Sequence, residues 1–312
     1  MKLKEIAERL DLSYFGNENI DILSVKYAKY ADENSIAVCN SKEDIAITKA
    51  KVCLTLPILL NTDKTLIYTY DIALTVYQLL KFLVRVGVYE DYSKIPKQNL
   101  LSENVYAGEN VCIGVNTTIN PFTVIGKNVQ IGNNCYIDNN VFIGSDVVIG
   151  NNVYINSGAK IGANSFFNYQ GKNVEPFCGV GTVIIGNNVN IGYNTIIQRG
   201  VLKNTVIGDY THLGNLIDVG HDTSIGKNCV VVSQSGFASN VTVGNNVRIF
   251  GQVGIANDII IEDDVIIKAK TVVSKNIKSG KVISGMYGSE NSEELKLQAR
   301  MRKFLKKNYR KE

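Results

Sequence analysis

The sequence predicts a mainly β protein in which short strands coil around a common axis. Three observations predict this fold class: an aliphatic residue recurs at every sixth position over most of the chain, glycine often follows it, and asparagine-rich corners lie between the repeats. A period of six fits neither an amphipathic helix, whose apolar positions recur at three and four, nor a plain alternating strand. The repeat therefore predicts short strands that stack coil upon coil.

The composition is that of an ordinary soluble globular protein. The 312 residues are 45% hydrophobic and 20% charged, and 33 Lys and Arg oppose 29 Asp and Glu, for a net charge of +4. So small a charge excludes nucleic-acid binding driven by bulk charge. Because the N-terminus lacks the apolar run of a signal peptide and no segment reads as a transmembrane span, we expect a cytoplasmic protein. The six cysteines are widely spaced without a CxxC pair, which favours buried thiols over disulfides or zinc.

Residues 1–98 precede the repeat and predict a small α/β domain. A short amphipathic helix begins at Leu3, and β-rich segments follow at 51–60 and 65–70. An apolar helix is expected from about Asp71 to Val86.

Residues 99–288 carry the repeat. The aliphatic frame runs from Leu101 to Ile161, resumes at Ile185, jumps by ten residues from Ile197 to Ile207 and then continues to Val273. Three hexads per turn give roughly eight to nine coils, with glycine and asparagine expected at the corners because they tolerate positive φ. This pattern resembles the left-handed parallel β-helix of hexapeptide-repeat proteins, and that resemblance sets the expected handedness.

Two segments depart from the hexad frame. The inserted loop 163–182 is aromatic, with Phe166 and Phe167 near its start, so we expect it to protrude and to cover a ligand or a neighbouring subunit. Residues 289–312 predict a C-terminal helix with eight basic and four acidic residues.

The histidines limit the search for chemistry, since the chain has only His212 and His221. His221 follows Val219 and Gly220 at an expected corner and is our candidate general base, because imidazole titrates near neutral pH. A metal site needs about three clustered ligands, so two histidines without a companion cysteine predict none. Asp218 and Asp222 both remain candidates to orient the imidazole.

The chain from Gly181 to Gly226 resembles the UDP-3-O-acylglucosamine N-acyltransferases of lipid A biosynthesis, commonly called LpxD. That family's TTIDRG, TxIG and DNxxQIxHN patterns correspond in order and spacing to TIIQRG, TVIG and GNLIDVGHD, which places the family's catalytic histidine on His221. Gln234 in VVSQSGFASN and Gln252 in IFGQVGI correspond to its later motifs. With Asn215, these glutamines are candidates for contacts with donor or sugar, and polar ladders at turns explain all three equally well.

The sequence also departs from the family's pattern at its expected pocket. NSFFNY, which contains Phe166 and Phe167, replaces DGFGY, and Asp258 stands where the family has a second active-site histidine. In the N-terminal domain AVCNSKE keeps Asn40 of FxxNPKY but lacks the aromatic rings expected to stack on uracil.

The resemblance implies an N-acyltransferase without a tightly bound cofactor. His221 would activate the amine of a nucleotide-linked amino sugar, held by the N-terminal domain, to attack the thioester of an acyl carrier protein or of coenzyme A. The expected acceptor is UDP-3-O-(3-hydroxyacyl)glucosamine, the expected assembly is a homotrimer, and the basic helix would contact the carrier protein or assist trimer packing. Two alternatives stay open: a coenzyme A-dependent N-acetyl or short-chain acyltransferase on a dTDP- or UDP-amino-deoxysugar, and a non-catalytic β-helix scaffold.

Overall fold

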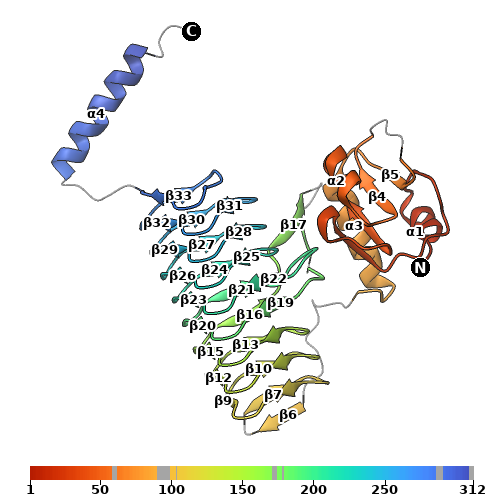
Figure 1. Ribbon diagram of the computed structural model, residues 1–312, viewed down its shortest axis with the longest axis horizontal. Helices are drawn as coiled ribbons and strands as arrows, with labels where there is room; N and C mark the ends of the chain where they lie inside the picture. Colours follow the sequence, from red (N-terminus) through yellow and green to blue (C-terminus); the bar gives the residue numbers. More distant parts are fainter. Residues whose placement is uncertain are drawn as a thin grey trace.

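The computed structural model describes residues 1–57, 62–89, 99–102, 104–170, 174–177, 179–285 and 291–308. Figure 1 shows a long column of stacked short strands, an α/β domain beside its middle, and the helix α4 (Asn291–Asn308) beyond its far end. In these described residues no helix is long and apolar enough to span a membrane.

The N-terminal domain is a five-stranded sheet flanked by helices. Its strands, in the order β1-β5-β4-β3-β2, are β1 (Tyr14–Phe15), β5 (Thr65–Tyr68), β4 (Val52–Thr55), β3 (Ser35–Val38) and β2 (Ser24–Tyr27). Its helices are α1 (Leu3–Leu10), the 3-10 turn η1 (Ala28–Tyr30), α2 (Lys42–Ile47) and α3 (Ile72–Arg85). Both expected helices are confirmed, and α3 begins where the Asp71 side chain accepts a hydrogen bond from the Leu74 N–H at 2.9 Å.

Three parallel sheets form the sides of the β-helix. The first sheet contains β6 (Asn99–Ser102), β7 (Val105–Ala107), β10 (Val124–Ile125), β13 (Phe142–Ile143), β16 (Lys160–Ala163), β21 (Ile196–Gln198), β24 (Asp218–Val219), β27 (Gly236–Phe237), β30 (Gly254–Ile255) and β33 (Val272–Val273), of which β6 pairs antiparallel. The second sheet contains β8 (Cys112–Ile113), β11 (Gln130–Ile131), β14 (Val148–Ile149), β19 (Val183–Ile185), β22 (Thr205–Ile207), β25 (Ser224–Ile225), β28 (Thr242–Val243) and β31 (Ile260–Ile261). The third sheet contains β9 (Thr118–Ile119), β12 (Tyr136–Ile137), β15 (Tyr154–Ile155), β20 (Asn190–Ile191), β23 (His212–Leu213), β26 (Val230–Val231), β29 (Arg248–Ile249), β32 (Ile266–Ile267) and β34 (Val282–Ile283).

The register of these sheets explains the period of six. Ile125 pairs with Ile143, and Ile143 pairs with Ile161, so one coil uses three hexads and each hexad supplies one strand to one sheet. All three of these isoleucine side chains are fully buried in a single aliphatic core that runs along the axis. The predicted stacking of coil upon coil is therefore confirmed.

Asparagine and glycine have different tasks at the corners. The third residue after the aliphatic position has the left-handed conformation, as at Asn134 (φ 57°) and Asn152 (φ 56°), which asparagine tolerates. Gly132 instead allows close packing, because a Cβ there would lie 2.5 Å from the Gly150 carbonyl oxygen of the next coil. The expectation that glycine marks the corners by a positive φ is thus wrong for Gly132: coil spacing requires it.

The insertion expected as a loop contains a β-hairpin. Strands β17 (Phe167–Gln170) and β18 (Val174–Phe177) pair antiparallel and pack against α3. The Tyr77 hydroxyl and the Lys81 ammonium both bond to the Glu175 carboxylate, the latter at 3.0 Å, and Phe177 meets the Tyr77 ring edge to face. These contacts join the hairpin to the N-terminal domain.

Candidate active site

His221 lies at the corner between the first and second sheets, directly after β24. Its Nδ1 is 2.9 Å from Asp222 Oδ2, and the side chains of the two residues are 12% and 0% exposed. An ionised carboxylate only accepts hydrogen bonds, so Nδ1 carries the proton and Nε2 keeps the free lone pair. That tautomer is the one a general base needs. Of the two aspartates considered from the sequence, Asp222 is the one that orients the imidazole.

Asp222 is itself held by a loop that enters the N-terminal domain. Its Oδ1 accepts hydrogen bonds from the backbone N–H groups of Val201, Leu202 and Lys203 at 3.0, 3.2 and 3.0 Å. The Val201 and Leu202 side chains are buried in the core of the N-terminal domain. Gly200 permits the tight turn, since a Cβ there would lie 1.5 Å from the Lys203 carbonyl oxygen.

This loop is the ten-residue jump in the hexad frame. The extra residues between Ile197 and Ile207 form the support for Asp222, a role that the sequence analysis did not assign. In the sequence, the ten-residue spacing from Ile197 to Ile207 was the feature that could have indicated this support. Through this loop the N-terminal domain is connected to the candidate base.

The hairpin brings one of its two expected phenylalanines to the site. The Phe167 ring meets the His221 imidazole edge to face, with centroids 5.9 Å apart. Phe166 is 81% exposed, and its backbone N–H donates to the Gln198 side chain at 2.9 Å. Phe167 therefore covers part of the imidazole, whereas Phe166 points away from the protein interior.

Three of the expected polar contacts lie at a different corner, between the third and first sheets. Asn215 Oδ1 accepts from the Tyr193 N–H at 2.9 Å, and Gln252 Nε2 donates to Gln234 Oε1 at 2.7 Å. These are ladder interactions between successive coils. Within one chain, the first sheet separates this corner from His221, so the structure does not bring these residues together with the base.

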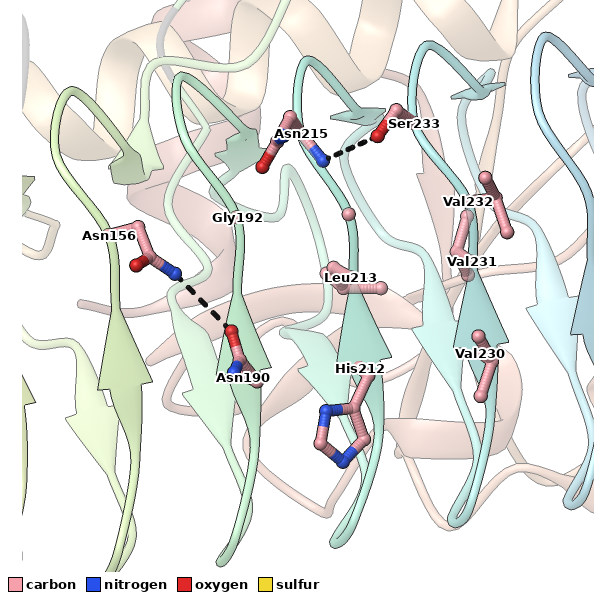
Figure 2. Close-up of a pocket in the computed structure, with 11 residues that line it drawn as sticks. Asn156, Asn190, Gly192, His212, Leu213, Asn215, Val230, Val231, Val232 and Ser233 are labelled. Atoms are coloured by element: carbon pink, nitrogen blue, oxygen red, sulfur yellow. Dashed lines mark hydrogen bonds between the residues drawn. The ribbon is translucent and has the colours of Figure 1, made fainter.

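A shallow hollow of about 330 Å³ lies on the third sheet and includes Asn215 but not His221. Figure 2 shows His212 within it, together with the bonds from Asn156 to Asn190 and from Asn215 to Ser233. Its polar groups are largely engaged with one another, and the candidate base lies at another corner. We therefore place the candidate active site at His221 rather than in this hollow.

Asp258 lies on the corner of His221, two coils further along. Its Oδ1 accepts from Asn240 Nδ2 at 2.7 Å, and the Asn240 N–H donates to the His221 carbonyl oxygen at 2.9 Å. Asn40 is exposed at the end of β3, where its N–H donates to Asp44 Oδ2 at 2.8 Å. In the part of the chain that the structure describes, no three His, Cys, Asp or Glu side chains gather as metal ligands.

The N-terminal domain contributes a group of residues that sequence analysis missed. Lys29 and Lys203 each place their ammonium near the Tyr30 ring, at 5.8 and 5.7 Å from its centroid. Burial raises the pKa of the neighbouring Tyr27, and the charges of Asp222 and Asp258 raise it further. The turn η1 therefore lies beside the corner that carries Asp222 and Asp258.

The outer face of the first sheet forms an open strip next to His221. Its outward positions run from Asp218 through Gly236 and Gly254 to Val272, each paired with the next. A Cβ added at either glycine would meet no atom within 4 Å, and Val272 is 80% exposed. These glycines are not required for packing within the chain, and they leave the sheet surface accessible to a ligand or another subunit.

Two hexapeptide-repeat families match segments of the coil. The family described as bacterial transferase hexapeptide (six repeats) matches residues 134–168, and the hexapeptide repeat of succinyl-transferase matches residues 105–143 and 182–215. Two solved acyltransferases share the fold. UDP-N-acetylglucosamine acyltransferase of Bacteroides fragilis is 29% identical with a TM-score of 0.53, over 64% of this chain and 78% of that one. The Francisella novicida enzyme of that name is 25% identical with a TM-score of 0.54, over 63% and 72%.

Curated relatives make the similarity more specific. The chain is 52% identical over 129 residues to the UDP-3-O-acylglucosamine N-acyltransferase of Rickettsia conorii, and 51% identical to enzyme 2 of that name from Legionella pneumophila. The protein of that name from Campylobacter curvus is 33% identical over 129 residues. The matches cover 41% of this chain, which spans 37 to 41% of the length of these relatives. The predicted left-handed β-helix and the resemblance to these N-acyltransferases are confirmed.

Proposed function

We propose that the protein transfers an acyl group from a phosphopantetheine thioester to the amine of a nucleotide-linked amino sugar. The observation that carries this proposal is the His221–Asp222 pair, with the aspartate fixed by three backbone amides. The names of the curated relatives favour UDP-3-O-(3-hydroxyacyl)glucosamine as the acceptor.

The pair supports a direct mechanism. His221 Nε2 accepts a proton as the sugar nitrogen attacks the thioester carbonyl carbon, and Asp222 stabilises the imidazolium that results. The tetrahedral intermediate then expels the thiolate as the carbonyl re-forms, and the imidazolium proton passes to the sulfur. The imidazole thus returns to its starting state, with an amide and a free thiol as products.

The open strip on the first sheet is the proposed track for a long acyl chain. It begins beside the corner of His221 and continues over Gly236 and Gly254, where no side chain obstructs the surface. Beyond Asp218, an acyl chain laid on this strip would contact the backbone of Gly236 and Gly254 and the side chain of Val272 rather than water. This arrangement favours a long acyl donor, carried by an acyl carrier protein.

A homotrimer would complete the site. Asn215, Gln234 and Gln252 lie at one edge of the first sheet and His221 at the other, so they meet a common ligand only if a second chain brings its corner to the first. Threefold closure would produce three equivalent sites of this kind. The acyl carrier, the trimer, the nucleotide-binding role of the N-terminal domain and a cytoplasmic location are parts of the proposal.

The contact of Phe167 with His221 favours a second candidate function. A ring beside the base leaves less space for a long chain, as expected of an N-acetyl or short-chain transferase that uses coenzyme A and a dTDP- or UDP-amino-deoxysugar. The third hypothesis is a β-helix scaffold without catalytic activity.

A thiol-release panel separates these functions. One reaction pairs UDP-3-O-acylglucosamine with 3-hydroxyacyl carrier protein, and the others pair acetyl-CoA with UDP- and dTDP-amino sugars. Turnover in the first reaction alone supports an N-acyltransferase of lipid A biosynthesis. Turnover only with acetyl-CoA and a deoxysugar supports the second candidate function. An absence of turnover in every pairing contradicts the proposed acyltransferase activity.

A further inference from the structure

Two lysines lie near one tyrosine ring at the junction between the N-terminal domain and the β-helix. Lys29 lies on the turn η1 and Lys203 on the loop that supports Asp222, so the two ammonium groups come from different parts of the chain. Both lie within 6 Å of the centroid of the Tyr30 ring, at 5.8 and 5.7 Å, and Tyr30 is 50% exposed. Both ammonium groups therefore lie around one half-exposed ring, where a ligand with several phosphate oxygens could reach them.

The charge of Lys203 is only partly compensated within the described residues. Lys203 is half-buried, and no described carboxylate lies within the 4.0 Å of an ion pair to it or to Lys29. Burial lowers the pKa of Lys203, the charge of Lys29 lowers it further, and the charges of Asp222 and Asp258 oppose this shift. A bound anion would stabilise the charged form of Lys203.

The two nearby carboxylates are engaged elsewhere. Asp222 accepts three backbone hydrogen bonds on Oδ1 and bonds His221 through Oδ2. Asp258 accepts from the Asn240 amide at 2.7 Å. Among the described residues neither carboxylate lies within ion-pair distance of Lys29 or Lys203, so neither occupies the hydrogen-bond donors of these ammonium groups, and both act on Lys203 only at longer range.

We propose that Lys29, Tyr30 and Lys203 form a phosphate subsite that holds the diphosphate of the nucleotide sugar next to His221. The choice of ligand rests on the proposed function. Ammonium groups bind phosphate oxygens as compact point charges, and the exposed Tyr30 side chain carries a hydroxyl group that can donate a hydrogen bond. Lys203 would connect phosphate binding with catalysis, because its backbone N–H donates a hydrogen bond to Asp222, the residue that orients His221.

Isothermal titration of the full chain with UDP, inorganic pyrophosphate and uridine tests the subsite. We expect Lys203→Met and Lys29→Met each to weaken UDP binding by about tenfold, with a similar loss for pyrophosphate and little change for uridine. Raising the salt concentration should weaken UDP binding to the wild type more than to either variant. Lys227→Met is the matched control, because Lys227 pairs with Asp209 at 2.9 Å on another corner.

Lys203→Arg and Lys29→Met keep the test decisive. Lys203→Arg retains the charge and should retain UDP binding. Lys29→Met alters an exposed residue, so it still tests the subsite if Lys203→Met fails to fold. Wild-type UDP affinity in both methionine variants would overturn the subsite, as would a wild type that binds neither UDP nor pyrophosphate. Because titration needs no acyl donor, lysine-dependent UDP binding without thiol release would preserve the subsite and reject the acyltransferase.

Discussion

Asp222 has two tasks: its Oδ1 holds the supporting loop, and its Oδ2 orients His221. Asp222→Ala removes both. Three backbone N–H groups lose their acceptor at about 1 kcal/mol each, the lower end of the cost of an unsatisfied buried donor, and alanine at φ 61° costs about 1 kcal/mol more. We therefore expect a loss of about 4 kcal/mol in the free energy of unfolding and a melting temperature lower by roughly 10 °C. Without an oriented imidazole, kcat should fall by about 10²- to 10⁴-fold.

Asp222→Asn separates the two tasks. Asparagine tolerates the left-handed conformation, and its carbonyl oxygen can accept from the three loop amides, so the melting temperature should fall only slightly. Its NH2 group then faces Nδ1 and donates to it, which places the imidazole proton on Nε2 and removes the lone pair that a general base needs, so kcat should fall at least as far as in the alanine variant. Thiol release measured well below the melting temperatures supplies the comparison. A kcat within about twofold of wild type in Asp222→Ala would refute the orienting role.

The remaining predictions concern the coil spacing, the acyl strip and the hairpin. Gly132→Ala should destabilise the protein by about 2 kcal/mol in calorimetry, because its Cβ would lie 2.5 Å from the Gly150 oxygen, whereas Gly254→Ala should change stability by less than about 0.5 kcal/mol. Gly254→Leu should slow turnover of long acyl donors more than that of acetyl-CoA, and equal slowing would argue against the strip. The hydrogen bond from Tyr77 and the ammonium of Lys81 lower the pKa of Glu175, so the contribution of Glu175 to hairpin docking is fully present above the ordinary glutamate value and is lost as pH falls through the lowered one. Glu175→Gln, with Glu109→Gln as control, should increase hydrogen exchange in β17 and β18 at neutral pH; unchanged exchange would contradict this.

The sequence was sufficient to predict the coil because the same six-residue pattern repeats along it. Each aliphatic residue of the hexad points inward, so the core at Ile125, Ile143 and Ile161 follows from the spacing alone. The short helix α1 and the longer helix α3 of the N-terminal domain were also predictable from their apolar periodicity.

The arrangement of the site was less predictable because adjacent hexads lie on different sides of a prism. Asn215 and His221 are six residues apart in the sequence, yet they lie at opposite edges of one sheet. The same ambiguity left Asp218 and Asp222 equivalent until the corner was seen. Lys29 and Tyr30 precede the repeat by many residues, and only tertiary packing brings them to Lys203.

The account depends most directly on His221 as the base. The decisive measurement is kcat for thiol release by His221→Ala, compared with His212→Ala, which removes the exposed histidine of the third sheet. With the acceptor and donor that the wild type uses, we expect His221→Ala to lose about 10²-fold or more in kcat and His212→Ala to retain the wild-type value. Equal activity in the two variants would contradict the central claim.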